Sequence, residues 1–114
     1  MKRGEVWRIN LDPTIGSEQK KTRPCVIVNH DKVGILPLKI IVPLTEWKDK
    51  FSQARWLVPI EASKQNGLRK KTAADTFQVR SLSEIRFVKR IGTLTEDEVK
   101  DIEKGLILSL DLAI

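Results

Sequence analysis

Arg23 is the first residue of this sequence whose type and position suit chemistry on a phosphate. It follows a polar loop, residues 12–22, that contains Lys20 and Lys21, and it begins an apolar run typical of a strand. A guanidinium has five donors and stays charged at any working pH, so it suits a phosphate or the pentacoordinate transition state of its reaction. Pro24 stiffens the backbone directly after it. A solvated loop with an arginine at the strand end would give the same pattern, so both interpretations stay open.

Thr45 and the pair Gln78 and Arg80 are the next candidates. Thr45 directly follows the apolar run 42–44, and a hydroxyl held at the end of a buried strand can hydrogen-bond a phosphate oxygen or a ribose hydroxyl. Gln78 and Arg80 are expected to alternate along one strand face, and amide and guanidinium groups read base edges or phosphates. A threonine that caps a turn and an ordinary solvent-facing strand are the structural alternatives.

The composition offers few of the side chains that usually bind a metal ion. The chain has one cysteine and one histidine, which excludes an intramolecular disulfide and the usual zinc ligand sets. We therefore predict no metal site and no cofactor. An imidazole suits general-base catalysis, but His30 lies in a predicted turn with no acidic partner at a recognisable spacing. Cys25, inside an apolar run, is expected to be a buried small hydrophobe, and Trp47 and Trp56 fit either base stacking or the core.

The charge is divided unevenly along the chain. The 114 residues carry a net charge of +6. Residues 1–94 hold 19 Lys and Arg against 9 Asp and Glu, a net of +10, and residues 95–114 hold 2 against 6, a net of −4. A strongly basic body predicts an anionic partner, of which nucleic acid is the commonest, although charge also serves solubility alone. No apolar run approaches the roughly 20 residues of a transmembrane helix and no signal-type stretch follows Met1, so we expect a cytoplasmic protein with no membrane partner.

A small β structure must position these residues. Short apolar or alternating runs bounded by turn residues predict strands; they cover residues 5–10, 24–28, 38–44, 55–60, 73–79 and 85–92. The continuous run 24–28 indicates a strand covered on both faces, and Asn66-Gly67 is a strong hairpin-turn dipeptide. The length predicts a single domain, residues 1–114.

The C-terminus changes to a helical period. Thr95 and Glu98 form a capping box, and the acidic residues 96–98 lie at the positive end of the helix dipole. Apolar positions then fall near one helical face: Val99, Ile102, Leu106, Leu110 and Ala113. The sequence therefore predicts a mostly β fold with α, a small curved antiparallel sheet or barrel with a C-terminal amphipathic helix packed on it.

The order of these signals along the chain is more specific than any one of them. The sequence reads Gly4-Glu5-Val6, then Asp12-Pro13-Thr14-Ile15-Gly16-Ser17-Glu18-Gln19, then Arg23-Pro24-Cys25-Val26-Ile27-Val28. In this order the blocks resemble the MazF/PemK (Kid-type) toxin family of type II toxin–antitoxin systems, with its D-P-x-x-G-S-E-Q loop and R-P strand. The resemblance continues at residues 42–45, 75–81 and 92–94 and so spans nearly the whole chain.

The resemblance implies an SH3-like β-barrel of the CcdB/PemK type with a C-terminal helix, assembled as a homodimer. It also implies a metal-independent, sequence-specific endoribonuclease that cuts single-stranded RNA such as mRNA and is restrained by a cognate antitoxin. We expect that antitoxin to present an acidic, partly disordered segment to the basic body.

By position, the resemblance assigns the family's catalytic arginine and threonine to Arg23 and Thr45, with Glu18 as a candidate general base. It implies attack by a ribose 2′-hydroxyl on the adjacent phosphate, which leaves a 2′,3′-cyclic phosphate and a 5′-hydroxyl. The expected RNA-binding residues lie in the loop before Arg23 and in the later Q-(I/V)-R motif: Ser17, Gln19, Lys20, Lys21, Gln78 and Arg80.

Two departures from the family pattern concern specificity. Lys20-Lys21 stand where small residues, often glycines, are common, and Glu46-Trp47 follow Thr45 where a small residue is more usual. The cleavage sequence is therefore not transferred. Two other functions stay open: a CcdB-like toxin that binds DNA gyrase without nuclease activity, and a non-catalytic RNA-binding module. The joint presence of Arg23 and Thr45 favours the nuclease.

Overall fold

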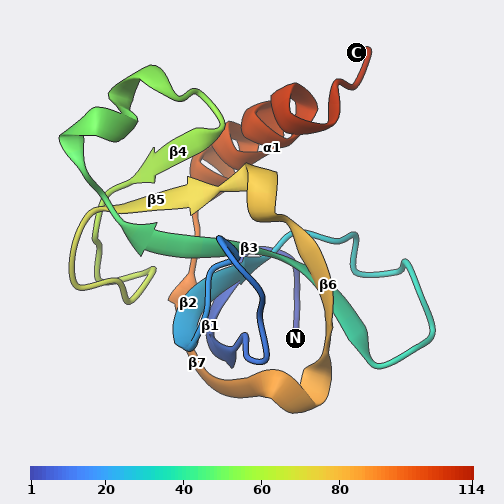
Figure 1. Ribbon diagram of the computed structural model, residues 1–114. Helices are drawn as coiled ribbons and strands as arrows, with labels where there is room; N and C mark the ends of the chain where they lie inside the picture. Colours follow the sequence, from blue (N-terminus) through green and yellow to red (C-terminus); the bar gives the residue numbers. More distant parts are fainter.

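The chain forms a strongly curved antiparallel sheet with one α-helix packed against it (Figure 1). The structure, a computed structural model, describes residues 1–114. Its strands are β1 (Glu5–Asn10), β2 (Thr22–Ile27), β3 (Leu38–Glu46), β4 (Leu57–Ile60), β5 (Thr72–Asp75), β6 (Arg80–Ser83) and β7 (Phe87–Thr93). Three 3₁₀ turns, η1 (Asp49–Gln53), η2 (Thr76–Gln78) and η3 (Glu84–Arg86), and the helix α1 (Glu96–Leu110) complete it. The predicted mostly β fold with a C-terminal helix is confirmed.

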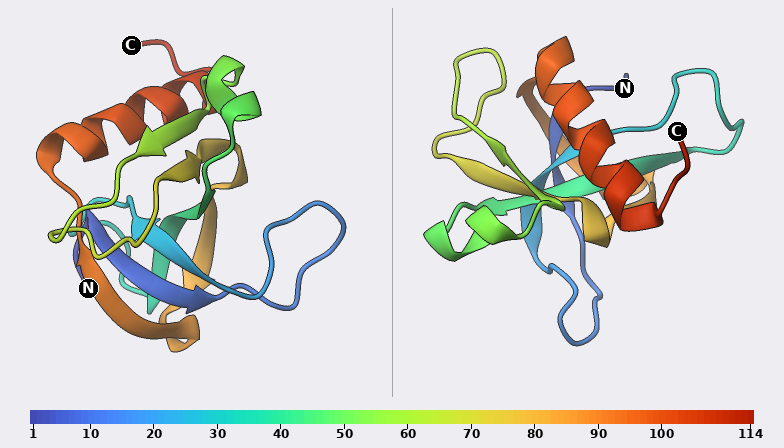
Figure 2. Two further views of the ribbon diagram at one scale, coloured as in Figure 1. Left: turned by 90° about the vertical axis from the view of Figure 1, so that its left-hand side faces the viewer. Right: turned by 90° about the horizontal axis from the view of Figure 1, so that it is seen from above.

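The sheet has the strand order β4-β5-β3-β2-β1-β7, with β6 also paired to β3. Strand β3 joins its two parts: the first half pairs with β2 and β6, and its last residues, 44–46, pair with β5. Figure 2 shows β3 crossing towards the β4–β5 hairpin, while the loop between β1 and β2 projects beyond the sheet. No helix combines the length and apolar character needed to span a membrane.

Strand β2 is apolar on both faces. Cys25 and Ile27 enter one buried cluster, and Val26 between them enters the other. Successive side chains of a strand point to opposite faces, so a strand between two clusters needs a continuous apolar run. The prediction of a strand covered on both faces is confirmed, and Cys25 is fully buried as expected.

The helix begins at the predicted capping box. Thr95 Oγ1 accepts a hydrogen bond from the Glu98 N–H, and Glu98 Oε1 accepts one from the Thr95 N–H. Further along the helix, Gly105 is buried. A Cβ at Gly105 would lie 2.8 Å from side-chain carbons of both Val58 and Thr76. Glycine therefore lets the helix approach β4 and η2 closely.

The predicted apolar face of the helix is only partly right. Val99, Ile102 and Leu106 pack on the core. Leu110, however, is 53% exposed, and Ala113 lies beyond the last helical residue. The helix ends before the apolar stripe completes its final turn, which leaves Leu110 in solvent.

The strand predicted over residues 73–79 is wrong beyond Asp75. The Asp75 carboxylate accepts a hydrogen bond from the Phe77 N–H and so turns the chain into η2. Gln78 therefore ends a 3₁₀ turn and Arg80 begins β6. The expectation that these two side chains share one strand face is wrong, because a turn set by one carboxylate interrupts the strand.

The β4–β5 hairpin also differs from the prediction. Its first strand begins at Leu57 rather than at residue 55, and its connecting loop spans residues 61–71. Asn66 is fully buried in this loop. Its side-chain oxygen accepts hydrogen bonds from the N–H groups of Ser63 and Leu68, both at 3.0 Å. Asn66 and Gly67 thus fold a longer loop around a buried amide instead of forming a two-residue turn.

Candidate active site

Arg23 and Thr45 line one cleft at the end of the β2–β3 pair. The register of these strands pairs Cys25 with Pro43, Val26 with Val42 and Ile27 with Ile41. Arg23 and Thr45 each lie two residues beyond the Cys25–Pro43 pair, where the paired register ends. Beyond this point β3 pairs with β5, where Thr45 lies opposite Ala73. Both side chains are half-buried, so the fold brings these two predicted residues together at a strand end.

The Arg23 side chain is oriented by the backbone of the loop before it. Its Nε donates a hydrogen bond to the Lys20 carbonyl at 2.9 Å. The six ion pairs of the molecule leave Arg23 without a carboxylate partner. Its remaining donors are therefore free of any acidic side chain that would compete with an anionic ligand.

Cys25 lies on the same face of β2 as Arg23, and the positive charges of Arg23 and Arg80 act on its thiol. Burial raises the pKa of Cys25 to about 12, although the charges of Arg23 and Arg80 act in the opposite direction. A thiol in this state is not a nucleophile at neutral pH. Arg80 reaches this face from β6, where it lies opposite Ile41 of β3. Two arginines from different strands thus act on one position.

Gln78 fastens the loop that precedes Arg23 to η2. Its Oε1 accepts a hydrogen bond from the Gln19 N–H at 2.6 Å, and its Nε2 donates to Asp75 Oδ2 at 3.1 Å and to the Ser17 carbonyl at 3.4 Å. At the base of the same loop, Arg86 donates to the carbonyls of Asn10 and Asp12. The projecting loop is therefore held at both ends by side chains from distant parts of the sequence.

Between this loop and η2 lies an open cleft of about 540 Å³, which we call the loop cleft. It is lined by Ile15, Ser17, Glu18, Phe77, Gln78, Val79 and Arg80. Glu18 is exposed here, and its Oε1 accepts a hydrogen bond from the Ile15 N–H at 2.5 Å. The structure thus groups four of the predicted site residues in a cleft that Arg23 and Thr45 do not line.

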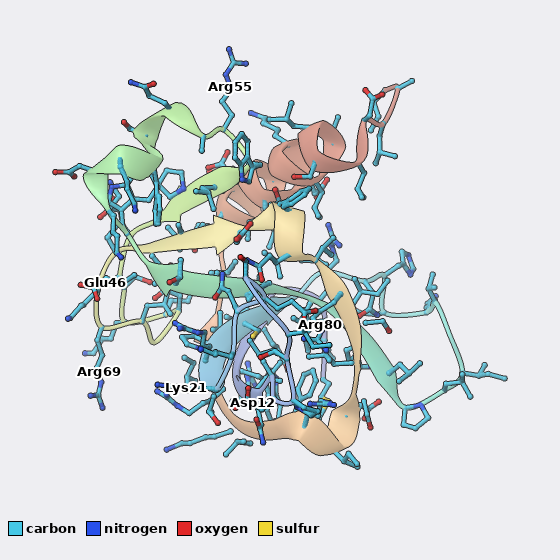
Figure 3. All side chains as sticks on the ribbon, viewed as in Figure 1. Asp12, Lys21, Glu46, Arg55, Arg69 and Arg80 are labelled. Carbon is cyan, nitrogen blue, oxygen red and sulfur yellow. The ribbon has the colours of Figure 1, made fainter.

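Lys20 and Lys21 are exposed, and they line neither the loop cleft nor the cleft beside Arg23 and Thr45. Lys21 has a left-handed backbone, with φ 69°, and this conformation favours glycine. Its N–H donates to Asp12 Oδ1 at 3.1 Å and its carbonyl accepts from the Leu11 N–H at 2.9 Å. In Figure 3 Lys21 lies to one side of the loop and Arg80 to the other. Lys21 therefore stands where the family pattern commonly has a small residue, and the left-handed backbone at this position is strained for a lysine.

A second, smaller cleft of about 220 Å³ adjoins Arg23 and Thr45, and we call it the basic cleft. Its polar lining includes Arg8, Arg23, Thr45, Glu46, Arg69, Lys70 and Thr72. Arg8, Arg69 and Lys70 were missed by the sequence analysis. The one signal for Arg69 and Lys70 was the run of basic residues 69–71, which resembles any solvated turn.

The other aromatic and titratable candidates lie away from these clefts or serve packing. His30 is exposed, and its Nδ1 accepts a hydrogen bond from the Lys32 N–H. Trp47 packs edge-on against Phe51, with the Lys71 ammonium 4.7 Å from its ring centroid. No three His, Cys, Asp or Glu side chains lie together in a way that would hold a metal ion.

The chain is similar to known toxins over nearly its whole length. Residues 2–110 match the family described as PemK-like, MazF-like toxin of type II toxin-antitoxin system. The chain is 30% identical over 118 positions to Endoribonuclease MazF9 of Mycobacterium tuberculosis, with 98% of each chain covered.

Two solved structures share its fold. MazF from Deinococcus radiodurans matches with a TM-score of 0.81 at 19% identity, covering 98% of this chain and 97% of that one. A mycobacterial endoribonuclease in complex with its cognate antitoxin matches with a TM-score of 0.76 at 18% identity, covering 100% of this chain and 98% of that one. The curled antiparallel sheet with one packed helix is the fold that this chain shares with these structures. This chain belongs to the PemK-like, MazF-like toxin family of type II toxin–antitoxin systems.

Proposed function

We propose that this toxin cuts single-stranded RNA by attack of a ribose 2′-hydroxyl on the adjacent phosphate, without a metal ion. The chain is a MazF-type endoribonuclease toxin of a type II system. The observation that supports the chemical proposal is the cleft that Arg23 and Thr45 line together, with no carboxylate paired to the guanidinium.

Arg23 and Thr45 are suited to different parts of this reaction. The 2′-oxygen forms a bond to phosphorus as the bond to the 5′-oxygen breaks, which gives a 2′,3′-cyclic phosphate and a 5′-hydroxyl. Negative charge builds up on the phosphoryl oxygens in the transition state, and the guanidinium of Arg23 stabilises it. The same group can donate to the departing 5′-oxygen. The Thr45 hydroxyl hydrogen-bonds a phosphoryl oxygen and orients the phosphate.

The proton of the 2′-hydroxyl needs an acceptor, and we propose Glu18. Its carboxylate is exposed and is held by the Ile15 N–H. To act as the base it has to move from the loop cleft towards the strand end where Arg23 and Thr45 lie. The tether from Gln78 to residues 17 and 19 fixes the backbone on either side of Glu18.

The remaining predicted residues suit binding of the RNA on either side of the loop. Gln78 and Arg80 present an amide and a guanidinium in the loop cleft beside Ser17, which suits bases and phosphates. Gln19 contacts Gln78 through its backbone N–H, which donates to Gln78 Oε1. Lys20 and Lys21 add positive charge at the end of the loop next to β2, which gives salt-dependent affinity.

An acidic antitoxin segment is the inhibitor that this surface favours. A solved mycobacterial relative is an endoribonuclease in complex with its cognate antitoxin. The net charge of +10 over residues 1–94 favours an acidic peptide that orders as it binds and excludes RNA. Competition titrations with a labelled, uncleavable RNA test this. Simultaneous binding of RNA and antitoxin, with neither changing the other's affinity, would exclude inhibition at the active site.

We also propose that residues 1–114 form one domain that works as a homodimer in the cytoplasm. Strand β2 contributes to both apolar clusters, so neither cluster stands alone. Trp56 is 42% exposed, and Leu108 and Leu110 are 50% and 53% exposed; a second copy would cover such side chains. Light scattering at micromolar concentration should give more than the monomer mass of 13.0 kDa, and the monomer mass alone would contradict the proposal.

The direct test is cleavage of a long single-stranded RNA in EDTA by the wild-type chain and by Arg23→Ala and Thr45→Val. We expect wild-type cuts that end in a cyclic phosphate. We expect a loss of about 100-fold or more for Arg23→Ala, as for removal of one transition-state donor, and a smaller loss for Thr45→Val. Neither variant should unfold, since both side chains lie at the surface end of their strands. Wild-type rates in Arg23→Ala, or activity that vanishes with chelator and returns with metal, would refute the mechanism.

A further inference from the structure

The basic cleft beside Arg23 and Thr45 carries more positive charge than local contacts neutralise. Arg8 and Arg69 have no carboxylate partner, and Lys70 pairs only with Glu46, at 3.6 Å. The Lys70 and Glu46 side chains are 73% and 64% exposed, and exposed pairs of this kind are weak. With Arg23, four cations and one carboxylate line a cleft of about 220 Å³.

The position of Arg8 adds to this excess. In the β1–β7 pair Arg8 lies directly opposite Lys89, and like charges in directly opposed cross-strand positions destabilise a sheet. No acidic side chain pairs with either residue. Repulsion between two cations that no carboxylate relieves is typical of a site where an anionic ligand supplies the missing negative charge.

The loop that carries Arg69 and Lys70 is fixed rather than free. Leu68, the residue before Arg69, is buried, and its N–H donates to the buried Asn66. Gly67 has φ 72°, and a Cβ there would lie 1.9 Å from the Ile91 carbonyl oxygen. The two cations therefore extend from a backbone packed against β7. Figure 3 shows Arg69 and Glu46 on the same side of the molecule.

We propose that Arg8, Arg69 and Lys70 form a phosphate-binding subsite for the RNA backbone next to the scissile phosphate. The inference rests on the proposed function, because it takes the scissile phosphate to lie between Arg23 and Thr45. These two residues line the basic cleft as well, so a strand bound at the reacting position continues into it. The cleft is smaller than typical sites for drug-sized ligands, which suits a phosphate held by guanidinium groups better than a stacked base. In the free protein the Glu46 carboxylate pairs with Lys70. When RNA binds, a phosphate takes the place of this carboxylate.

The subsite acts on binding rather than on the chemical step, and this sets the test. A long uncleavable RNA and a short RNA that lacks phosphates flanking the scissile one are titrated against wild type, Arg69→Ala, Lys70→Ala and Glu46→Gln. Lys64→Ala is the matched control, because Lys64 is an exposed lysine of the same loop that lines no part of the cleft. Thermal unfolding of each variant checks its fold.

For the long RNA we expect Arg69→Ala and Lys70→Ala each to weaken binding about 10-fold or more, as for loss of a charged hydrogen bond. The slope of log K against log salt becomes shallower by about 0.7 for each cation removed. Glu46→Gln tightens binding, since it removes the competitor for Lys70. In cleavage assays the loss appears in KM, with kcat within about twofold, and it disappears for the short RNA. Separate truncations on the 5′ and 3′ sides identify which flank the subsite holds.

Equal losses for the short and long RNA would overturn the proposal, as would a loss in Lys64→Ala as large as in Arg69→Ala, or unchanged binding in both cleft variants. Failure of the proposed reaction gives a different result. A wild-type chain that binds RNA but never cuts it contradicts the catalytic mechanism, while the uncleavable RNA still reports on the subsite.

Discussion

Gln78 fastens the β1–β2 loop to the body of the protein, and Gln78→Glu tests how much that contact contributes. The amide accepts from the Gln19 N–H and donates to Asp75 Oδ2 at 3.1 Å. A glutamate keeps the size and the acceptor. It loses the donor, and it brings a second carboxylate against Asp75, which is 9% exposed.

The expected cost follows from these contacts. A hydrogen bond to a charged group contributes about 1.5–3 kcal/mol, and repulsion between two carboxylates adds to its loss. The new side chain can escape by turning into solvent, which releases the loop and limits the total. We expect the free energy holding the loop closed to fall by about 2 kcal/mol, which corresponds to roughly a 30-fold increase in the open population.

Trypsin digestion measures this opening directly, because trypsin cleaves after lysine and the loop contains Lys20 and Lys21. Time-limited digestion at pH 7, followed by mass spectrometry, should show nicking after these residues about 30-fold faster in Gln78→Glu than in wild type when opening is in rapid equilibrium. RNA cleavage should fall as well, since the Lys20 carbonyl orients Arg23. The difference in urea stability from wild type should shrink towards pH 4, because protonation of one carboxyl restores a donor.

Gln53→Glu makes the same change of charge at an exposed position whose side chain makes no hydrogen bond, and its nicking rate should stay within about twofold of wild type. Nicking of Gln78→Glu at the wild-type rate, or equal acceleration in both variants, would show that Gln78 does not hold the loop.

Three further changes test other parts of the structure. Lys21→Gly should raise the free energy of unfolding by up to about 1 kcal/mol in urea, because φ 69° strains a lysine; Lys20→Gly, where φ is not positive, should lower it. Thr72→Val should raise it by about 1 kcal/mol by thermal unfolding, because the Thr72 hydroxyl is buried with no partner; a loss of stability would mean that the hydroxyl is satisfied. Burial acts to raise the pKa of Glu5, but a hydrogen bond from the Trp7 indole and nearby positive charges outweigh it and lower the pKa. The stability that Glu5 contributes is therefore present above its unfolded pKa of about 4.3 and is lost as the pH falls through the lower folded value; Glu5→Gln should flatten the acid limb of the stability profile, and an unchanged limb would contradict this account.

The sequence was most informative where one local rule decides the structure. The apolar run of β2 placed it between two clusters, and Thr95 and Glu98 located the start of the helix. Arg23 and Thr45 were singled out by residue type and position and given their roles by the resemblance, and the structure groups them in one cleft. Each of these features depends on a pattern that short-range physics can interpret.

The features that sequence analysis missed depend on contacts between distant segments. The turn at Asp75 needs its carboxylate to accept from the Phe77 N–H, and residue alternation carries no sign of that bond. Gln78 contacts residues 17 and 19 only after the sheet has curled. Arg8 and Arg69 share a cleft although they are far apart in the chain, so no spacing rule links them.

The bond from Arg23 to the carbonyl of residue 20 has a consequence for how such loops diversify. Every amino acid offers the same carbonyl, so the side chain at position 20 can be exchanged without disturbing the orientation of the Arg23 guanidinium. Under the proposed mechanism, substitutions there change what the loop offers to the RNA and leave the bond-breaking step intact. The proposed site thereby separates target choice from chemistry, because the two depend on different parts of residue 20.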